Sequence, residues 1–287
     1  MKFNTKCVHG SGKPDSTGAI SPAIYMSSTF SHPQLGDTTG YQYTRESNPT
    51  RDRLEQLMAG LEEGTDALAF SSGMAAVDAV FHLFSPGDHI ILGDDLYGGS
   101  IRMFTNIYEQ NGIEFTYVGT SDLDAVKAAF RPNTKAVYIE TPTNPMMEIT
   151  DIRALCALAH ERNALVIIDN TFLSPYFQKP LTLGADIVVH SGTKFIGGHH
   201  DVISGFTIVN DDELAAKLRL TYKTVGACLS AMDSWLVIRG VKTLALRMEQ
   251  HQKNAIALAE WLKKQPKVTK VLFPGLPEHP GYEINKA

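Results

Sequence analysis

Short apolar runs rich in valine and isoleucine recur along most of this chain, and helix-like segments separate them. The runs predict strands at 66–70, 89–93, 113–118, 135–140, 164–169, 186–190 and 205–209. The segments between them predict helices at 73–84, 98–111, 122–130 and 151–162. Runs of this length are typical of strands that are buried on both faces. The pattern therefore predicts an α/β fold, with a mostly parallel sheet that helices cover on both faces.

The same pattern divides the chain into three parts. Residues 1–46, rich in Gly, Ser, Thr and Pro, predict an extended N-terminal arm with short helical turns. Residues 47–240 carry the alternating strands and helices and predict the large domain. Residues 241–287 predict a long amphipathic helix and the start of a C-terminal domain. We expect a single strand at 268–274 there, without partner strands, and the domain looks incomplete.

A clear helix start opens the large domain. Asn48 can cap the helix, and Pro49 suits its first turn. The amphipathic segment that follows is expected to end at Gly64.

Bulk properties exclude several classes of protein. The 287 residues have a formal net charge of -5 and no Lys/Arg-rich run, which argues against a nucleic-acid partner or an anionic membrane surface. No apolar segment approaches the ~20 residues needed to span a bilayer, and the N-terminus lacks an apolar signal core. Cys7, Cys156 and Cys228 are far apart, which argues against a disulfide framework. We expect a cytoplasmic protein.

Polar groups follow two of the predicted strands. Asp169 ends one strand, while Ser191, Thr193 and Lys194 follow another. In open α/β sheets, ligands bind at the carboxyl ends of the strands. A carboxylate, an amine and hydroxyl groups at one edge suit pyridoxal phosphate, which needs an anion at its ring nitrogen, an amine for its aldehyde and donors for its phosphate. An exposed lysine and a helix-capping aspartate are the alternatives, and the pairing of Asp169 with Lys194 favours the cofactor.

Three further segments are candidates for the same edge. Gly73 and Met74 lie between a strand and a helix, where backbone N–H groups can face an anion, or where the chain only makes a tight capped turn. Tyr97 follows a strand and can stack on a planar ring or pack on the surface. Asn144 can bind a cofactor oxygen or start a turn. The spacing matches neither GxGxxG nor a P-loop.

The histidines and methionines predict structural roles. His199 and His200 are adjacent, and neither they nor His190 belong to a set of metal ligands. We therefore expect hydrogen bonding and no metal. The methionines are expected to pack, apart from the backbone of Met74.

Several motifs together resemble the cystathionine gamma-lyase and gamma-synthase family of trans-sulfuration enzymes. They are TGYQYTRESNPTRDRLE, FSSGMAA, DDLYGG, YIETPTNP, IIDNTF and DIVVHSGTKFIGGHHDVISG, and they extend over most of the chain. The resemblance implies the fold-type I scaffold of pyridoxal-phosphate enzymes.

The resemblance also implies a role for each candidate. Lys194 carries the cofactor covalently and then serves as the general base, and Asp169 pairs with the ring nitrogen. Tyr97 stacks on the ring and handles protons on the substrate amine or the sulfur leaving group. Asn144 lies near the ring hydroxyl. The phosphate is bound by the remaining four, which are Gly73, Met74, Ser191 and Thr193.

The family assigns Tyr43 and Arg45 to the cofactor phosphate of a neighbouring subunit. Arginine suits this role because its planar fork binds phosphate through two hydrogen bonds. The resemblance thus implies active sites shared between chains and a homotetramer built from dimers.

The activity implied is that of a C–S lyase or γ-replacement enzyme acting on cystathionine or a related sulfur amino acid. A methionine gamma-lyase or an O-acylhomoserine sulfhydrylase is the first alternative, although Gly99 stands where methionine gamma-lyases carry a cysteine. An aminotransferase of the same fold and a non-catalytic paralogue are further alternatives.

One part of the family pattern has no counterpart here. Family members continue for roughly a hundred more residues, about a small domain. That part supplies the arginine that binds the substrate carboxylate. The resemblance therefore leads us to expect a truncated chain that binds the cofactor but turns over amino acids poorly.

Overall fold

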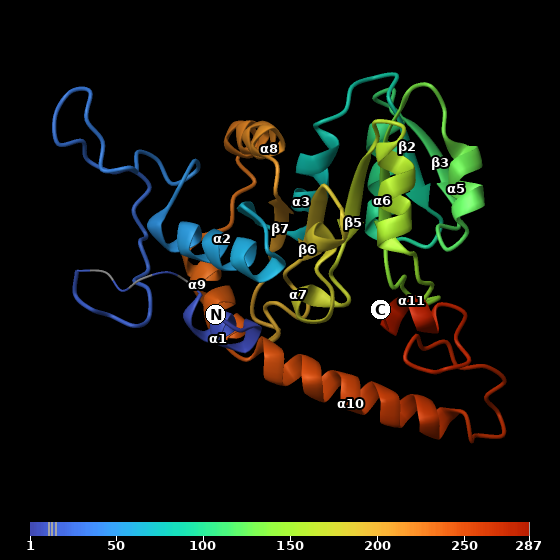
Figure 1. Ribbon diagram of the computed structural model, residues 1–287. Helices are drawn as coiled ribbons and strands as arrows, with labels where there is room; N and C mark the ends of the chain where they lie inside the picture. The colour runs from blue at the N-terminus through green and yellow to red at the C-terminus, as the bar shows by residue number, and fades with distance from the viewer. Residues whose placement is uncertain (11, 13, 15, 287) are drawn as a thin grey trace.

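The computed structural model describes residues 1–10, 12, 14 and 16–286 and contains one seven-stranded sheet (Figure 1). The strand order is β1-β7-β6-β5-β4-β2-β3. The strands are β1 (Asp66–Phe70), β2 (His89–Gly93), β3 (Glu114–Val118), β4 (Thr134–Glu140), β5 (Leu165–Asp169), β6 (Ile187–Ser191) and β7 (Gly205–Val209). Only β7 runs antiparallel to its neighbours. The predicted mostly parallel sheet is confirmed.

The direction of the strands gathers their carboxyl ends at one edge. β7 is antiparallel to both β1 and β6, so β1 and β6 run the same way. The remaining strands pair in parallel with β6, directly or through their neighbours. The loops that follow every strand except β7 therefore begin at the same edge of the sheet.

Helices surround this sheet and extend beyond it. They are α1 (Phe3–His9), α2 (Pro49–Glu62), α3 (Gly73–Phe81), α4 (Gly98–Met103), α5 (Leu123–Ala129), α6 (Ile152–His160), α7 (Ser174–Phe177), α8 (Asp212–Val225), α9 (Ala231–Val241), α10 (Leu244–Leu262) and α11 (Tyr282–Lys286). A π-helical segment η1 (Phe104–Tyr108) follows α4, and a 3₁₀ turn η2 (Pro180–Leu183) precedes β6.

Both faces of the sheet are covered, as predicted, because successive side chains of a strand point to opposite faces. On one face, Tyr138 and Val189 belong to a core that includes α3, η1 and α8. On the other face, Val188 packs with α2 and α9, and Val137 packs with α6. The buried strands thus form a rigid platform beneath the loops at the carboxyl edge.

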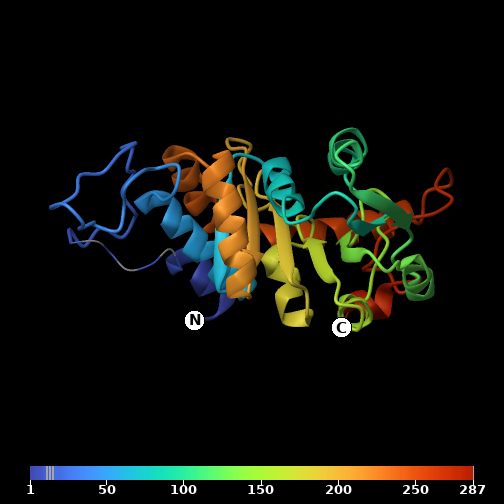
Figure 2. The ribbon, with the colours of Figure 1, turned by 90° about the horizontal axis from the view of Figure 1, so that it is seen from above.

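The chain beyond this platform is organised differently at its two ends. Residues 16–46 project from one end of the molecule in both views (Figures 1 and 2), and this described part contains no helix or strand except an isolated bridge between Thr29 and Tyr43. At the other end, α10 leads to a C-terminal segment that folds back, with Gly281 against Ile149.

Two predicted elements differ from the structure. Residues 268–274, all of them described, form no strand. A strand needs a neighbour for its backbone groups, and no sheet edge pairs with this described segment. The predicted helix 98–111 is interrupted, because α4 changes to the π-helical η1 at Phe104. Within the described part of the chain, no helix is both long and apolar enough to cross a membrane.

The predicted helix start at Asn48 is confirmed. The Oδ1 atom of Asn48 accepts hydrogen bonds from the backbone N–H groups of Thr50 and Arg51. Its amide nitrogen donates to the carbonyl of Tyr25 at 2.9 Å and to the hydroxyl of Thr44 at 3.1 Å. The side chain is fully buried. Asn48 therefore caps α2 and also fixes the base of the N-terminal arm.

We expect Asn48→Ala to lower the free energy of unfolding by about 2 kcal/mol, because it removes a cap and leaves buried partners unpaired. Asn48→Asp keeps the accepting oxygen and loses the donors to the arm, so its effect should be intermediate. Asp122→Ala removes the exposed cap of α5 and is the control, with an expected loss of about 1 kcal/mol. Urea unfolding measures all three. Equal losses for Asn48→Ala and Asp122→Ala would show that the arm contacts contribute nothing.

Candidate active site

The two strands that carry Asp169 and Lys194 are neighbours in the sheet. β5 pairs in parallel with β6, and Asp169 lies opposite Val189. The backbone N–H of Thr171 donates to Asp169 Oδ1 at 3.0 Å, and the Thr171 hydroxyl accepts from the N–H of Ser191 at 2.8 Å. The adjacency predicted from the sequence is confirmed, and Thr171 joins the two strand ends.

The environment of Asp169 disfavours its negative charge. Burial raises the pKa of this carboxyl, while hydrogen bonds from Thr171 oppose the shift. The Tyr138 hydroxyl lies 3.5 Å from Asp169 Oδ2, at the limit of a hydrogen bond. A desolvated carboxylate of this kind favours a cationic ligand.

A second carboxylate, not singled out from the sequence, lies beside the first. Glu140 ends β4 directly opposite Asp169 in the parallel register and is 6% exposed. Burial, and then the charge of Asp169, raise the pKa of Glu140 to about 8. Among the described residues, no lysine or arginine forms an ion pair with either carboxylate. Neither carboxylate is therefore neutralised by a direct ion pair with a described lysine or arginine.

The start of α3 forms a close junction with the end of β6. The Ser72 hydroxyl caps α3 by accepting from the N–H of Ala75 at 3.1 Å. A Cβ atom on Gly73 would lie 2.8 Å from Ser191 Cβ and 3.0 Å from its hydroxyl oxygen, so only glycine fits this junction. The Thr193 hydroxyl accepts from the N–H of Ser204 at 3.1 Å. The Thr193 hydroxyl also donates to the carbonyl of Ser204 at 3.2 Å, so the helix N–H groups and the Ser191 hydroxyl are the donors here that suit an anion.

Lys194 lies in a tight turn directly after β6. Its N–H donates to the carbonyl of Ser191 at 3.3 Å, and its carbonyl accepts from Gly198 at 2.9 Å. Arg247 of α10 stabilises the turn by donating to the carbonyls of Phe195 at 2.6 Å and Gly240 at 3.0 Å. The backbone is thus fixed while the Lys194 side chain is exposed. An exposed amine on a fixed turn is available to a ligand at this edge.

Tyr97 lies at the start of α4, with its ring against Gly99 and 54% of its surface exposed. Its backbone N–H donates to Glu140 Oε2 at 3.1 Å. Met74 of α3 contacts α4 through its sulfur, 4.0 Å from the Ser100 hydroxyl. The loop after β2 is thereby attached to the end of β4 and to α3.

Asn144 is exposed in the loop that follows β4. Asp95 holds this loop by accepting from the N–H of Met146 at 3.0 Å. The loop thus begins at the same edge, but no contact in the described chain joins the Asn144 side chain to the other candidates.

Tyr43 and Arg45 are not brought to the other candidates within one chain. The Arg45 guanidinium lies 5.3 Å from the centre of the Tyr43 ring and donates to the carbonyl of Lys223 in α8. Tyr43 is 42% exposed. Both residues belong to the projecting arm, and among the described residues no hydrogen bond or ring contact joins either of them to Asp169 or Lys194.

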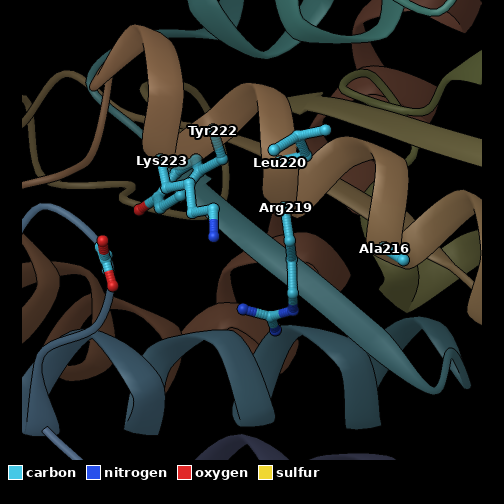
Figure 3. Close-up of a pocket in the computed structure, with 6 residues that line it drawn as sticks. Ala216, Arg219, Leu220, Tyr222 and Lys223 are labelled. Atoms are coloured by element: carbon cyan, nitrogen blue, oxygen red, sulfur yellow. The ribbon is translucent and has the colours of Figure 1, made fainter.

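A cavity of about 410 Å³ lies beside α8 (Figure 3). Its lining consists of Glu46, Ala216, Arg219, Leu220, Tyr222 and Lys223. Arg219 is engaged by Asp66 through two hydrogen bonds and so is not available to an anion. None of the candidate residues lines this cavity, but two of them contact its lining: Arg45 donates to the carbonyl of Lys223, and the carbonyl of Tyr43 accepts from the N–H of Glu46 at 3.0 Å.

The histidines have other partners. His190 Nε2 lies 2.6 Å from Glu62 Oε1, and both side chains are fully buried. His199 Nδ1 lies 2.9 Å from the carbonyl of Gly197. Within the described ranges, no group of three or more His, Cys, Asp or Glu residues is arranged to hold a metal ion.

The carboxylate pair predicts a pH-dependent stability for the cofactor-free chain. Because the pKa of Glu140 is raised on folding, its stabilising contribution is complete below about pH 4.5 and is lost as the pH rises to about 8. Burial also raises the pKa of Glu55 to about 7, so both Glu55 and Glu140 contribute to the fall in stability near neutral pH. In urea unfolding, the free energy of unfolding should fall by up to about 1.4 kcal/mol for each unit by which the pH rises.

Two variants separate these contributions. Glu140→Gln should reduce the fall in the free energy of unfolding between pH 7 and 8 by more than Glu55→Gln does, because Glu140 has the higher pKa. A fall in this interval that Glu140→Gln leaves unchanged would contradict the assignment.

The chain matches known enzymes over its whole length. The family model for Cys/Met metabolism PLP-dependent enzymes covers residues 4–287. A cystathionine beta-lyase of Lactococcus lactis subsp. cremoris is 50% identical over 285 residues, which are 99% of this chain and 75% of the relative. A cystathionine gamma-synthase of Mycobacterium tuberculosis is 47% identical over 283 residues, which are 98% of this chain and 73% of the relative.

A solved structure agrees with these matches. The crystal structure of a cystathionine gamma-lyase from Lactobacillus plantarum complexed with L-serine superposes with a TM-score of 0.97 and 49% identity, covering 100% of this chain and 75% of that one. The resemblance stated from the motifs is confirmed. This chain therefore belongs to the family of pyridoxal-phosphate-dependent enzymes of cysteine and methionine metabolism.

Proposed function

We propose that this protein is a C–S lyase or γ-replacement enzyme of trans-sulfuration that acts on cystathionine or a related sulfur amino acid. The observation that carries the proposal is the pair of neighbouring strand ends, with the half-buried Asp169 on one and the amine of Lys194 on the other. Relatives named as cystathionine beta-lyase and gamma-synthase support the substrate class.

The residues present fit pyridoxal phosphate. The Asp169 and Glu140 pair lacks a cation, and the ring nitrogen of the cofactor supplies one when it is protonated. The junction of Gly73 and Ser191, which a Cβ would fill, offers helix N–H groups to the phosphate. Lys194 supplies the amine that the aldehyde needs.

Each side chain then has a distinct task. When bound, pyridoxal phosphate supplies an electron sink for the charge that develops at the α-carbon of the substrate. The Lys194 amine binds the cofactor and then moves the proton at the α-carbon. Asp169 holds the proton at the ring nitrogen. Tyr97 stacks on the ring and moves a proton at the substrate amine or the leaving sulfur.

The remaining candidates bind the cofactor. Gly73, Met74, Ser191 and Thr193 surround the phosphate, and Asn144 lies near the ring hydroxyl. Residues 47–240 form the domain that carries these groups, between the arm of 1–46 and the C-terminal part of 241–287.

Tyr43 and Arg45 act on the phosphate in a neighbouring subunit. Their place on a projecting arm, without a contact to Asp169 of their own chain, supports this role. The protein is accordingly proposed to be a homotetramer of dimers with shared active sites, located in the cytoplasm. A monomer would lack two phosphate ligands.

Cofactor binding is tested by colour and by reduction. The purified protein with pyridoxal phosphate should be yellow, and borohydride should fix the cofactor on the peptide that contains Lys194, as mass spectrometry detects. Lys194→Ala should abolish this attachment, since it removes the amine that follows β6 at this edge of the sheet. Lys127→Ala, which changes an exposed lysine of α5, is the control and should label normally. Labelling of Lys194→Ala at another lysine would overturn the assignment, and a colourless wild-type protein would favour a non-catalytic paralogue.

Product analysis tests the reaction. Incubation with cystathionine should release an amino-acid thiol, either homocysteine from β-elimination or cysteine from γ-elimination. Release of methanethiol from methionine instead would favour the methionine gamma-lyase alternative. Amino transfer to a keto acid, without release of sulfur, would indicate an aminotransferase.

A further inference from the structure

Glu140 occupies a position that neither the substrate nor the cofactor assignment explains. Its side chain is buried at the end of β4, opposite Asp169, and its Oε2 atom accepts the backbone N–H of Tyr97 at 3.1 Å. The N–H of Tyr97 belongs to the first turn of α4, where a backbone donor has no helical acceptor. Glu140 therefore supplies a partner to the helix start and fixes the backbone of Tyr97, the residue proposed to stack on the cofactor ring.

The carboxyl of Glu140 faces mainly negative groups. Asp169 lies beside it on β5, and Asp95 approaches from the loop after β2. Behind Asp169 lie the Tyr138 hydroxyl of β4 and the imidazole of His190 on β6. Two desolvated carboxylates side by side do not both ionise readily, so the pair retains one proton near neutral pH.

We propose that Glu140 is a positioning residue with two linked actions: it holds the Tyr97 backbone in place for ring stacking, and the Glu140–Asp169 pair releases one proton to solvent when the cationic ring nitrogen of the cofactor binds. The O–H bond of the shared carboxyl proton breaks, and the ring N–H⁺ replaces the lost positive charge. This inference rests on the proposed function, because it assumes that the ring nitrogen binds at Asp169.

The proton release makes the affinity for the cofactor depend on pH. At pH values where the cofactor-free pair still holds its proton, the affinity for the cofactor should increase by up to tenfold for each unit by which the pH rises. This is the dependence expected when binding releases one proton. The attachment of an aldehyde to Lys194 would add its own pH dependence. Pyridoxine 5′-phosphate avoids this complication, because it has the ring nitrogen and the phosphate but no aldehyde.

The experiment measures the dissociation constant of pyridoxine 5′-phosphate between pH 6 and pH 8 for the wild type and two variants. Glu140→Gln keeps an oxygen that accepts from Tyr97 but cannot titrate. Glu140→Leu has a similar volume and no acceptor. Glu148→Gln changes a carboxylate outside the pair and serves as the matched control, and urea unfolding verifies that each variant is folded.

The wild type should bind pyridoxine 5′-phosphate more tightly as the pH rises. A plot of the logarithm of its association constant against pH should have a slope that exceeds the slope for Glu140→Gln by about one, which corresponds to one proton. Equal slopes for the wild type and Glu140→Gln would contradict the proposed proton release. Glu140→Leu should bind about tenfold more weakly than Glu140→Gln at every pH and show a weaker near-ultraviolet circular dichroism of the bound ring. Equal affinities for these two variants would overturn the positioning of Tyr97.

Failure of this inference differs from failure of the proposed function. If the wild type binds neither pyridoxine 5′-phosphate nor pyridoxal phosphate, the cofactor assignment itself is wrong. If the wild type binds both and Glu140→Gln behaves identically at every pH, only the proton release is wrong. If Glu140→Leu does not fold, the slope of Glu140→Gln still decides the proton release. In that case Glu140→Met, which also lacks a carboxyl oxygen, tests the contact with Tyr97.

Discussion

The parallel register of β4, β5 and β6 is the constraint on which the rest of the site depends. It sets Glu140 opposite Asp169 and places β6, which leads to Lys194, next to β5. These strands are buried on both faces, so a shift in register would expose core side chains and bury polar ones. The core therefore determines the spacing of the polar groups, and the groups themselves contribute little to that spacing.

Much of this arrangement could be predicted from the sequence. Buried strands have a distinctive composition, and their order along the chain implied the sheet and its polar edge. Asp169 and Lys194 stood out because charged residues directly follow apolar runs. Glu140 has the same signal at the end of its own run, but this position alone does not distinguish it from an ordinary surface glutamate. Its significance depends on the register, which places it beside Asp169.

Other features could not be predicted because they depend on contacts between distant segments. The expected strand at 268–274 has suitable side chains, but whether they form a strand is decided by the presence of a partner edge. The change from α4 to η1 at Phe104 occurs where aromatic rings pack against each other, with the Phe81 and Phe104 rings stacked at 4.3 Å. The attachment of Tyr97 to Glu140 joins residues from different strand ends and has no local signature.

The bond between Arg247 and the turn that carries Lys194 has a consequence for biosynthesis. Arg247 follows Phe195 by 52 positions in the chain, yet its guanidinium contacts the carbonyl of Phe195 at 2.6 Å. During translation, the strands that frame the site leave the ribosome well before this arginine does. The turn therefore lacks its stabilising donor until α10 has been synthesised and has docked. The final geometry of the turn that carries Lys194 thus depends on a residue synthesised after all seven strands of the described sheet.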